Sequence, residues 1–413
     1  MADDRKPKEQ QGLPEGWKWV RLEEVANLVK DISPAGSKPY LEIGDIDILS
    51  KNYTIKEKES PNHCIKAKRG NIVISKVRPT RGAISLIKEN FLYVSPAFSV
   101  LEADNSKFLF YSLSRQQFFN YLGALETGTT YPSVNDKDVM NYELPLPPLP
   151  EQRKIAEILE TVDNAIEKTE KIIEKYKRIK QGLMQDLLTK GIDENGNIRS
   201  EKTHKFKDSP LGRIPEEWEV VRLGEVGEII MGQSPPSALV NQEGNGIPFL
   251  QGSAEFGAKY PLPKNWIVKP LKLAPKNSIL ISIRAPVGDL NIADKVYCIG
   301  RGLAAIKVNN SKANNFFIWF VLHLFSDRLV KISQGSTFEA IGHNELNNFL
   351  IPLPPLSEQK RIAEILSQID QTIEKEEKYK QKLERLKKGL MEDLLTGKVR
   401  VNKLLEGENH GMA

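Results

Sequence analysis

Residues 145–163 read PLPPLPEQRKIAEILETVD and open a block of 45 residues that ends in GLMQDLLT at position 189. A second copy of the block occupies residues 352–396, where it begins PLPPLSEQKRIAEILSQID and ends GLMEDLLT. The two copies are identical at 28 of the 45 positions and align without a gap. Their offset of 207 residues is too long for one unit of a solenoid, whose period is about 20 to 50 residues. The repeat therefore indicates that a whole domain was duplicated together with its helix.

Each block predicts a proline-rich elbow followed by a long helix. Beyond the elbow, apolar residues recur at alternating steps of four and three, which is the heptad pattern of a helix that packs on another helix. Pro150 and Ser357 stand at the expected helix starts, and Gly191 and Gly397 stand just past the expected ends. A helix of about 38 residues is roughly 57 Å long, and neither helix could bury such a stripe by itself.

The favoured interpretation is that the two helices pack on each other as an antiparallel pair. The alternative is two separate surface helices, each on its own domain. In the second helix the heptad positions reach Glu376 and Lys380, so we expect its apolar face to shift toward Tyr379, Leu383, Leu386 and Leu390. The predicted seam of the pair consists of Ile155, Leu159, Val162, Ile166, Ile173, Leu183, Ile362, Leu366, Ile369, Ile373, Leu383 and Leu390.

A fainter repeat extends into the rest of the chain. Leu13–Val29 aligns with Ile214–Ile230 at an offset of 201 residues, so the second half gains six residues later on, and we expect them within Gln233–Gly252. The predicted fold class is α+β, with two α/β domains related by pseudo-twofold duplication and separated by two long, antiparallel, coiled-coil-like helices. The predicted ranges are 1–150 for the first domain, 151–190 for the first long helix, 191–357 for a linker and the second domain, and 358–413 for the second long helix and tail.

Within the two domains, short apolar runs predict buried strands, and stretches rich in aromatic residues predict helices that face the core. The predicted strands lie within 71–75, 91–101, 277–282 and 296–308, and the predicted helices cover 106–122 and 311–329.

Three sets of loops are candidates for binding. SKVRPTRGA (75–83) corresponds to SIRAPVGD (282–289), TGTTYPS (127–133) corresponds to QGSTFEA (334–340), and the segment 233–251 is the expanded part of the second copy. Arg and Lys can read guanine edges or bind phosphate, Ser, Thr and Gln offer hydrogen bonds, and Tyr can stack on a base. Ordinary solvated loops are an equally good interpretation of any one residue. The candidate DNA contacts are Lys76, Arg78, Arg81, Thr129, Thr130, Tyr131, Ser133, Gln233, Gln251, Arg284, Ser336, Thr337 and Phe338.

Composition narrows the class of protein further. The chain has 413 residues, 40% hydrophobic residues and a net charge of +5, with no strongly basic segment, so tight binding to nucleic acid would need a partner. No apolar stretch is long enough to span a membrane, and the N-terminal residues lack the apolar core of a signal peptide. Cys64 and Cys298 occupy non-equivalent positions of the repeat, so we expect no disulfide and a cytoplasmic location.

Catalytic motifs are not visible in the sequence. We find no phosphate-binding loop of the GxxxxGK[ST] type, no clustered Cys and His residues, no GxSxG elbow and no [DN]PP[YFW] tetrapeptide of the kind that amino-methyltransferases use. The sequence therefore predicts no catalytic, cofactor-binding or metal-binding residue in this chain.

The combination of motifs resembles the specificity subunits of type I restriction-modification systems, often called HsdS. The resemblance depends on the PLPPLxEQ elbows, the two IAEIL runs, the two GLMxDLLT helix ends and the openings LPEGW (13–17) and IPEEW (214–218). It covers both repeats. It implies that each globular domain is a target-recognition domain that reads one half of a split DNA site, while the paired helices set the gap between the half-sites.

The resemblance also implies partners. Two methyltransferase subunits would dock on this chain and supply S-adenosylmethionine binding and adenine methylation, and motor-nuclease subunits would join them to cleave unmodified double-stranded DNA. This chain would itself be non-catalytic and would bind no cofactor and no membrane. Two rival classes remain open: a coiled-coil scaffold that binds only proteins, and an enzyme whose active site has no recognisable motif.

Overall fold

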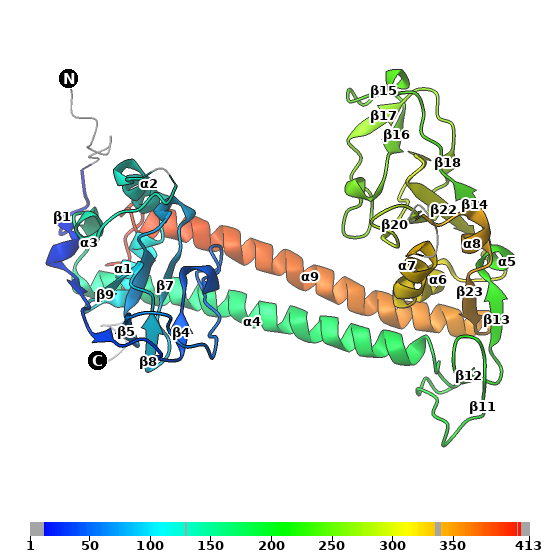
Figure 1. Cartoon of the computed structure of the whole chain (residues 1–413), viewed down its shortest axis with the longest axis horizontal. Helices are drawn as coiled ribbons and strands as arrows, with labels where there is room; N and C mark the ends of the chain where they lie inside the picture. Colours follow the sequence, from blue (N-terminus) through cyan, green and yellow to red (C-terminus); the bar gives the residue numbers. More distant parts are fainter. Residues whose placement is uncertain (1–11, 129, 335–339, 403, 406–413) are drawn as a thin grey trace. The chain divides into compact units, whose positions relative to one another are not determined.

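The computed structural model describes residues 12–128, 130–334, 340–402 and 404–405 (Figure 1). The chain packs as two compact units. Unit 1 comprises residues 1–170 and 378–413, and unit 2 comprises residues 171–377. Each unit holds one globular domain, named domain 1 and domain 2, together with part of each long helix. In the described part of the chain, no helix is long and apolar enough to cross a membrane.

The long helices are α4 (Leu149–Leu187) and α9 (Leu356–Leu394). Each begins at its elbow in the same way, because the elbow glutamine folds back on the proline-rich segment. Gln152 Nε2 donates to the carbonyl of Pro147 and Gln359 Nε2 donates to that of Pro354, both at 2.8 Å. Both glutamines are buried. The repeated sequence at the elbow thus produces the same buried helix start in both units.

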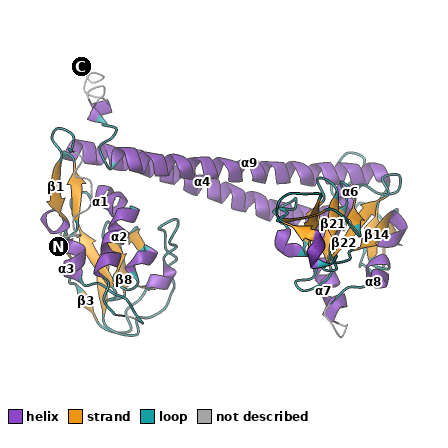
Figure 2. Ribbon diagram, turned by 90° about the horizontal axis from the view of Figure 1, so that it is seen from above, coloured by secondary structure: helices purple, strands orange, loops and turns teal. Residues whose placement is uncertain are grey.

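The parts of α4 and α9 within each unit run antiparallel (Figures 1 and 2). Ion pairs between the helices establish the direction, because their positions rise along α4 as they fall along α9. The pairs are Asp163–Lys387 at 2.6 Å and Glu170–Lys380 at 2.7 Å in unit 1, and Lys177–Glu377 at 2.7 Å and Lys180–Asp370 at 2.6 Å in unit 2. The alternative interpretation, in which the two helices lie separately on the surface, is therefore wrong.

The residues of the predicted seam are all buried or half-buried. Ile155 and Leu159 also enter the core of domain 1, and Ile362 and Leu366 enter that of domain 2. The expected shift of the apolar face in α9 is only partly confirmed. Leu383 is buried and Leu390 is half-buried, whereas Tyr379 and Leu386 are each 51% exposed. Instead the polar residue Lys380 stays on the seam, where its ammonium pairs with the Glu170 carboxylate. Because this ion pair compensates the charge of Lys380, the lysine can stay at the contact between the two helices.

Domain 1 contains one strand pair and two four-stranded sheets. The pair is β1 (Lys18–Arg21) with β10 (Glu143–Leu146). The first sheet has the order β2-β9-β6-β7, with β2 Asn27–Leu28, β9 Phe98–Glu102, β6 Ile72–Ser75 and β7 Ile84–Leu86. The second has the order β3-β5-β8-β4, with β3 Ile32–Ser33, β5 Cys64–Lys68, β8 Phe91–Val94 and β4 Tyr40–Leu41. Pairing is antiparallel except between β4 and β8.

Domain 2 repeats this plan with an enlarged second sheet. The strand pair is β13 (Glu219–Arg222) with β23 (Leu350–Leu353). The first sheet has the order β14-β22-β19-β20, with β14 Gly227–Met231, β22 Leu303–Val308, β19 Ile279–Ser282 and β20 Leu290–Ile292. The second has the order β15-β17-β16-β21-β18, with β15 Val240–Asn241, β17 Asn265–Ile267, β16 Ile247–Leu250, β21 Tyr297–Ile299 and β18 Leu273–Ala274. β15 lies in the segment where we expected the extra residues. A hairpin of β11 (Phe206–Lys207) and β12 (Ile214–Pro215) precedes the domain.

The predicted fold class is confirmed, with mixed helix and strand content in both domains and two long helices. The predicted strands are confirmed by β6, β8, β9, β19, β21 and β22. Each predicted aromatic helix is instead two helices. In domain 1 these are α1 (Ser106–Leu113) and α2 (Gln116–Leu125), and in domain 2 they are α6 (Asn315–Leu324) and α7 (Ser326–Gln334). The break in domain 1 occurs because Arg115 has extended backbone angles, φ −77° and ψ 149°.

The core of each domain continues into the long helices. In unit 1 the apolar faces of β6, α1 and α2 pack in one cluster with Ile155 of α4 and Leu394 of α9. In unit 2 the fully buried Trp218 packs in a cluster with Leu187 of α4 and Ile362 of α9. The remaining short helices are α3 (Asp136–Met140), α5 (Leu223–Val226) and α8 (His343–Asn347). Continuous cores fix each domain on its segment of the helix pair.

Candidate nucleic-acid interface

Two of the predicted loops of domain 1 lie side by side. The loop after β6 forms a β-bridge with the loop after α2 through Val77 and Ser133. The Arg78 amide donates to the carbonyl of Pro132 at 2.7 Å, and the Val134 amide donates to that of Lys76 at 3.0 Å. These backbone bonds join segments that are more than 50 residues apart in the sequence.

The side chains of this loop pair differ in solvent exposure and in whether they form an ion pair. Arg78 has a left-handed backbone, φ 48°, which is uncommon outside glycine. Its guanidinium lies 5.5 Å from the ring centroid of Tyr131, which is 69% exposed. Arg81 and Thr130 are exposed, whereas the Lys76 ammonium pairs with the Asp136 carboxylate at 3.1 Å. The candidate Thr129 lies outside the described residues.

Domain 2 contains the equivalent loop pair. Arg284 forms a β-bridge with Ala340, and the Ile341 amide donates to the carbonyl of Ile283 at 2.9 Å. Each partner lies 207 residues beyond its counterpart in domain 1, so the structure bears out the alignment of both loops. Arg284 is exposed. The candidates Ser336, Thr337 and Phe338 lie outside the described residues.

The remaining two candidates of domain 2 lie at strand ends beside this loop pair. Gln233 follows β14, and its amide donates to the carbonyl of Ile299 at 2.9 Å. Gln251 follows β16, and its Nε2 lies 3.5 Å from the Ser234 hydroxyl. The backbone amide of Arg301 also donates to that hydroxyl, at 3.2 Å. The exposed Arg301 is not among the residues predicted from the sequence, although the Gly-Arg-Gly triplet at 300–302 is typical of an exposed turn.

A repeated contact fixes each domain on the helix pair. In unit 1 the Tyr111 hydroxyl of α1 donates to Asp163 at 2.8 Å, and the Lys387 ammonium lies 5.7 Å from the Tyr111 ring centroid. Burial and the nearby carboxylate raise the pKa of Tyr111, so its hydroxyl remains a donor. In unit 2 the Lys180 ammonium lies 5.6 Å from the ring centroid of Phe320 in α6. Lys180 and Lys387 are equivalent residues of the repeat, so the same cation–aromatic contact recurs.

A second repeated arrangement, the elbow cluster, lies where one helix starts and the other ends. In unit 2 the buried Glu358 at the start of α9 pairs with Arg199, which follows α4, and Arg199 Nη2 lies 3.2 Å from Glu358 Oε2. Trp218 Nε1 and the Ile192 amide also donate to this carboxylate, at 3.2 and 2.9 Å. A Cβ on Gly191 would lie 2.2 Å from Glu358 Oε1, so only glycine fits there.

The elbow cluster of unit 1 uses equivalent residues with fewer bonds. Glu151 at the start of α4 pairs with Arg400, which follows α9, and Arg400 Nε lies 2.9 Å from Glu151 Oε2. Trp17 occupies the place of Trp218, but its Nε1 has no hydrogen-bond partner within the described ranges. The Arg400 side chain is 26% exposed, compared with 10% for Arg199. The cluster of unit 2 is therefore the more completely bonded.

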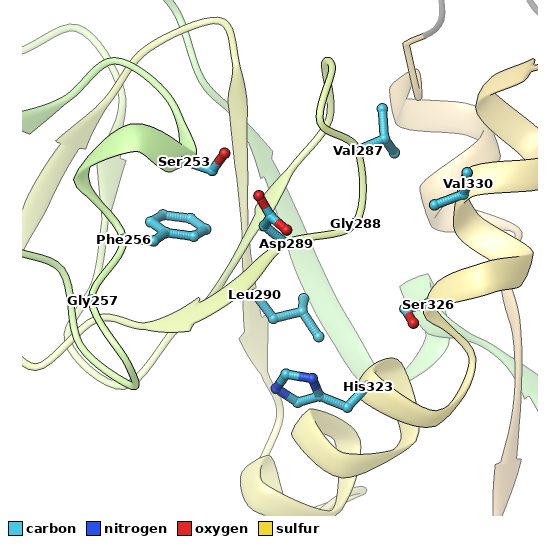
Figure 3. A pocket seen from close by; sticks show the side chains of 10 residues that line it. All are labelled: Ser253, Phe256, Gly257, Val287, Gly288, Asp289, Leu290, His323, Ser326 and Val330. Atoms are coloured by element: carbon cyan, nitrogen blue, oxygen red, sulfur yellow. The ribbon is translucent and has the colours of Figure 1, made fainter. Parts of the chain in front are cut away.

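Domain 2 also has an open cavity of about 510 Å³ beneath the loop that follows β19 (Figure 3). Its lining includes Phe256, Asp289 and His323. His323 lines the cavity and is partly exposed. Desolvation of its ring and the nearby Lys180 cation lower its pKa from 6.5 to about 4. The imidazole is therefore neutral at pH 7. Across the described residues, no group of three or more His, Cys, Asp or Glu side chains could hold a metal ion.

Comparisons with known proteins identify the family. The model of the type I restriction modification DNA specificity domain matches residues 14–178 and 215–385. The MjaVIII specificity subunit of the type I restriction enzyme from Methanocaldococcus jannaschii is 33% identical over 96% of this chain and 96% of its own length. The putative MjaX specificity subunit from the same organism is 44% identical over 76% of this chain and 72% of its own length.

Solved structures agree with this result. A chain from a study of complex assembly and conformational transition in the type I restriction-modification system is 34% identical, has a TM-score of 0.58, and is matched over 94% of this chain and 99% of that chain. The S subunit of the type I system from M. genitalium has a TM-score of 0.64 at 16% identity, over 95% of this chain and 98% of that chain, and so supports the fold. The chain belongs to the family of type I restriction-modification specificity subunits, as the sequence motifs indicated.

Proposed function

We propose that this chain is the non-catalytic subunit that selects the DNA sequence for a type I restriction-modification complex. Domain 1 reads one half of a bipartite site and domain 2 reads the other half. The observation that supports this most strongly is the repeated loop pair, Val77 with Ser133 and Arg284 with Ala340. The two domains present the same backbone frame with different exposed side chains, as expected of two readers with different target sequences.

The partners proposed for the complex supply the chemistry. Two methyltransferase subunits bind S-adenosylmethionine and methylate adenine, and motor-nuclease subunits cleave unmodified DNA. Their participation also accounts for the modest net charge of +5, because a single weakly basic chain has little electrostatic affinity for DNA. In this proposal the charged outer faces of α4 and α9 dock the methyltransferase subunits.

The pair of Arg78 and Tyr131 is the proposed reader of the first half-site. We expect Arg78→Ala to lower the preference at one position of that half-site by about 5- to 150-fold, because a bidentate arginine–base contact discriminates by roughly 1–3 kcal/mol. The second half-site should be unchanged. Methylation of a random duplex library by the reconstituted complex measures both preferences.

Lys88→Ala is a matched control for this substitution. It removes an exposed cation of domain 1 that belongs to neither loop of the pair and whose Nζ bonds to Asn52 at 2.9 Å. We expect it to leave both half-sites as they are. Equal loss at both half-sites in Arg78→Ala would show a folding defect or a contact with phosphate alone, and would contradict the assignment of Arg78 as a reader.

The proposed role of the helix pair is to set the gap between the half-sites. Domains that dock on one face of DNA need centres about 34–36 Å apart, or a multiple of this distance. Seven residues inserted after Glu170 in α4 and after Glu377 in α9 keep the heptad pattern and add about 10.5 Å of helix. We expect the gap to lengthen by up to about three base pairs, given roughly 3.4 Å per base pair, with the half-sites unchanged.

The sequenced methylation motif reads the gap and the half-sites in one measurement. An insertion in α4 alone is the control, because it breaks the register of ion pairs such as Lys180–Asp370. It should reduce methylation without producing a defined new gap. Half-sites that change while the gap stays constant would show that the helices are not the spacer.

A further inference from the structure

We propose that Arg284 and Arg301 act together as a guanine-reading pair of domain 2. The proposal rests on the proposed function and adds a residue, Arg301, that the repeat does not reveal. It also names the class of base that the second half-site contains. Both residues lie just beyond one end of the ladder between β19 and β22.

The ladder brings the two arginines to neighbouring positions. Ser282 of β19 pairs with Leu303 of β22, and the pairing continues where the Ile283 amide donates to the carbonyl of Gly302 at 2.9 Å. The next position on one segment is Arg284, and on the other it is Arg301. Each arginine is thus the immediate chain neighbour of one partner of the Ile283–Gly302 backbone bond, which places the two residues on adjoining segments just beyond the end of the ladder.

The backbone that carries each arginine is fixed. Arg284 is bridged on its other side to Ala340. Arg301 occupies a tight turn in which the Leu303 amide donates to the carbonyl of Gly300 at 3.0 Å. A Cβ on Gly302 would lie 2.9 Å from the carbonyl oxygen of Gln251, so this turn packs closely against the end of β16. A rigid frame reduces the entropy that a reading side chain loses on binding.

Both guanidinium groups are available to a ligand. Arg284 and Arg301 are exposed, and within the described ranges neither guanidinium has a hydrogen-bond or ion-pair partner. Most arginines that lie near the elbows do have one, as Arg199 and Arg400 show. Arginine binds O6 and N7 of guanine through two parallel hydrogen bonds, which is the commonest specific contact in the major groove. The Gln251 amide, bonded to Ser234, lies next to the pair and can contact an adjacent base.

Comparison with domain 1 shows that the two positions are variable in a fixed frame. The Lys76 amide donates to the carbonyl of Ala97 at 2.8 Å, as the Ile283 amide does to Gly302, and the Phe98 amide donates to the carbonyl of Ser95 at 3.0 Å. By these bonds, Val77 takes the place of Arg284 and Pro96 takes the place of Arg301. Domain 1 therefore has no cation at either position, and its arginines lie farther along the loop after β6. The two domains therefore share the backbone structure here but differ in the side chains it carries, as expected of two domains with different target sequences.

The test uses the full chain reconstituted with its cognate modification subunit and a random duplex library as substrate. The half-site of domain 2 is defined as the one that changes when residues 226–349 are exchanged for those of another family member. We expect Arg301→Ala to relax one G·C position of that half-site by about 5- to 150-fold. Arg301→Lys should relax the same position, because lysine keeps the charge but lacks the planar fork. Arg284→Ala should relax a neighbouring G·C position.

Lys307→Ala is the matched control, because it removes one exposed cation from the far end of β22. It should leave the motif unchanged. If the wild-type complex yields a split motif that Arg301→Ala and Arg284→Ala leave intact, or relax only at A·T positions, the arginine pair is refuted while the proposed function stands. If the active wild-type complex yields no split motif, the proposed function itself fails.

Discussion

Glu358→Ala is expected to destabilise unit 2 by about 3 kcal/mol. Glu358 is 7% exposed and accepts hydrogen bonds from Arg199, Trp218 and the Ile192 amide. Removing one partner of a buried ion pair costs about 3–5 kcal/mol, because the other charge stays buried and unpaired. Arg199 keeps a second contact with Glu217 at 3.3 Å, which places the expected loss at the lower end of this range.

Urea unfolding followed by segment-resolved hydrogen exchange measures the free energy of each unit separately. Glu201→Ala is the control, since it removes the exposed carboxylate that pairs with Arg213 at 3.0 Å, and exposed pairs contribute at most about 1 kcal/mol. Glu151→Ala should destabilise unit 1 by less than Glu358→Ala destabilises unit 2, because Arg400 is more exposed than Arg199. A loss in Glu358→Ala no larger than that of Glu201→Ala would show that the elbow cluster does not hold unit 2 together.

Exchange of residues 25–142 for the corresponding part of another specificity subunit is expected to replace the first half-site entirely. Specific protein–DNA binding exceeds non-specific binding by about 10³- to 10⁷-fold, so methylation at the original site should fall to background. These limits keep β1, β10 and the elbow cluster of unit 1 with the helices. They move both recognition loops of domain 1 as one piece, and the donor should offer a hydroxyl at the place of Tyr111, which bonds to Asp163.

The reciprocal exchange in domain 2, residues 226–349, is the matched control. It should replace the second half-site and leave the first unchanged. Both motifs are determined by sequencing the adenines that the reconstituted complex methylates. A change in both half-sites after either exchange would show that the domains do not read independently.

The elbows were the part of the fold most readily predicted from the sequence. The glutamate and glutamine after PLPPLx are identical in both copies because they make equivalent buried contacts: Gln152 and Gln359 bond to the elbow prolines, and Glu151 and Glu358 pair with arginines. Those arginine partners were not predictable. Arg199 and Glu358 are 159 residues apart, and no local pattern relates a residue after one helix to the start of the other.

Local sequence patterns also gave wrong predictions where contacts with other parts of the chain determine the structure. The stretch 106–122 is apolar enough for one helix, yet Arg115 adopts an extended backbone and divides it. In α9, the sequence pattern suggested that Lys380 would leave the seam, but the Glu170 carboxylate across the pair holds it there. The period of the apolar residues shows which face of a helix is apolar. It does not show which residue of the other helix lies opposite a charged side chain.

The sequence predicted the loops of the candidate interface and candidate residues within them, but not how the loops pair. The loops after β6 and β19 were recognised from their Gly, Pro and Arg content, and the structure joins each to its partner loop through equivalent bridges. Arg301 was not predicted because the equivalent position of the first copy holds Pro96, which is not a cation. A repeat reveals what the copies share, and specificity lies in what they do not share.

The central claim is that this chain selects a bipartite DNA site. Genome-wide mapping of methylated adenine in the source cell, with and without the gene, tests it most directly. The account predicts a split motif with two half-sites and a fixed gap, which disappears on deletion and returns when the gene is restored. Adenine methylation that stays unchanged on deletion, in cells shown to produce the active cognate modification subunit, would contradict it.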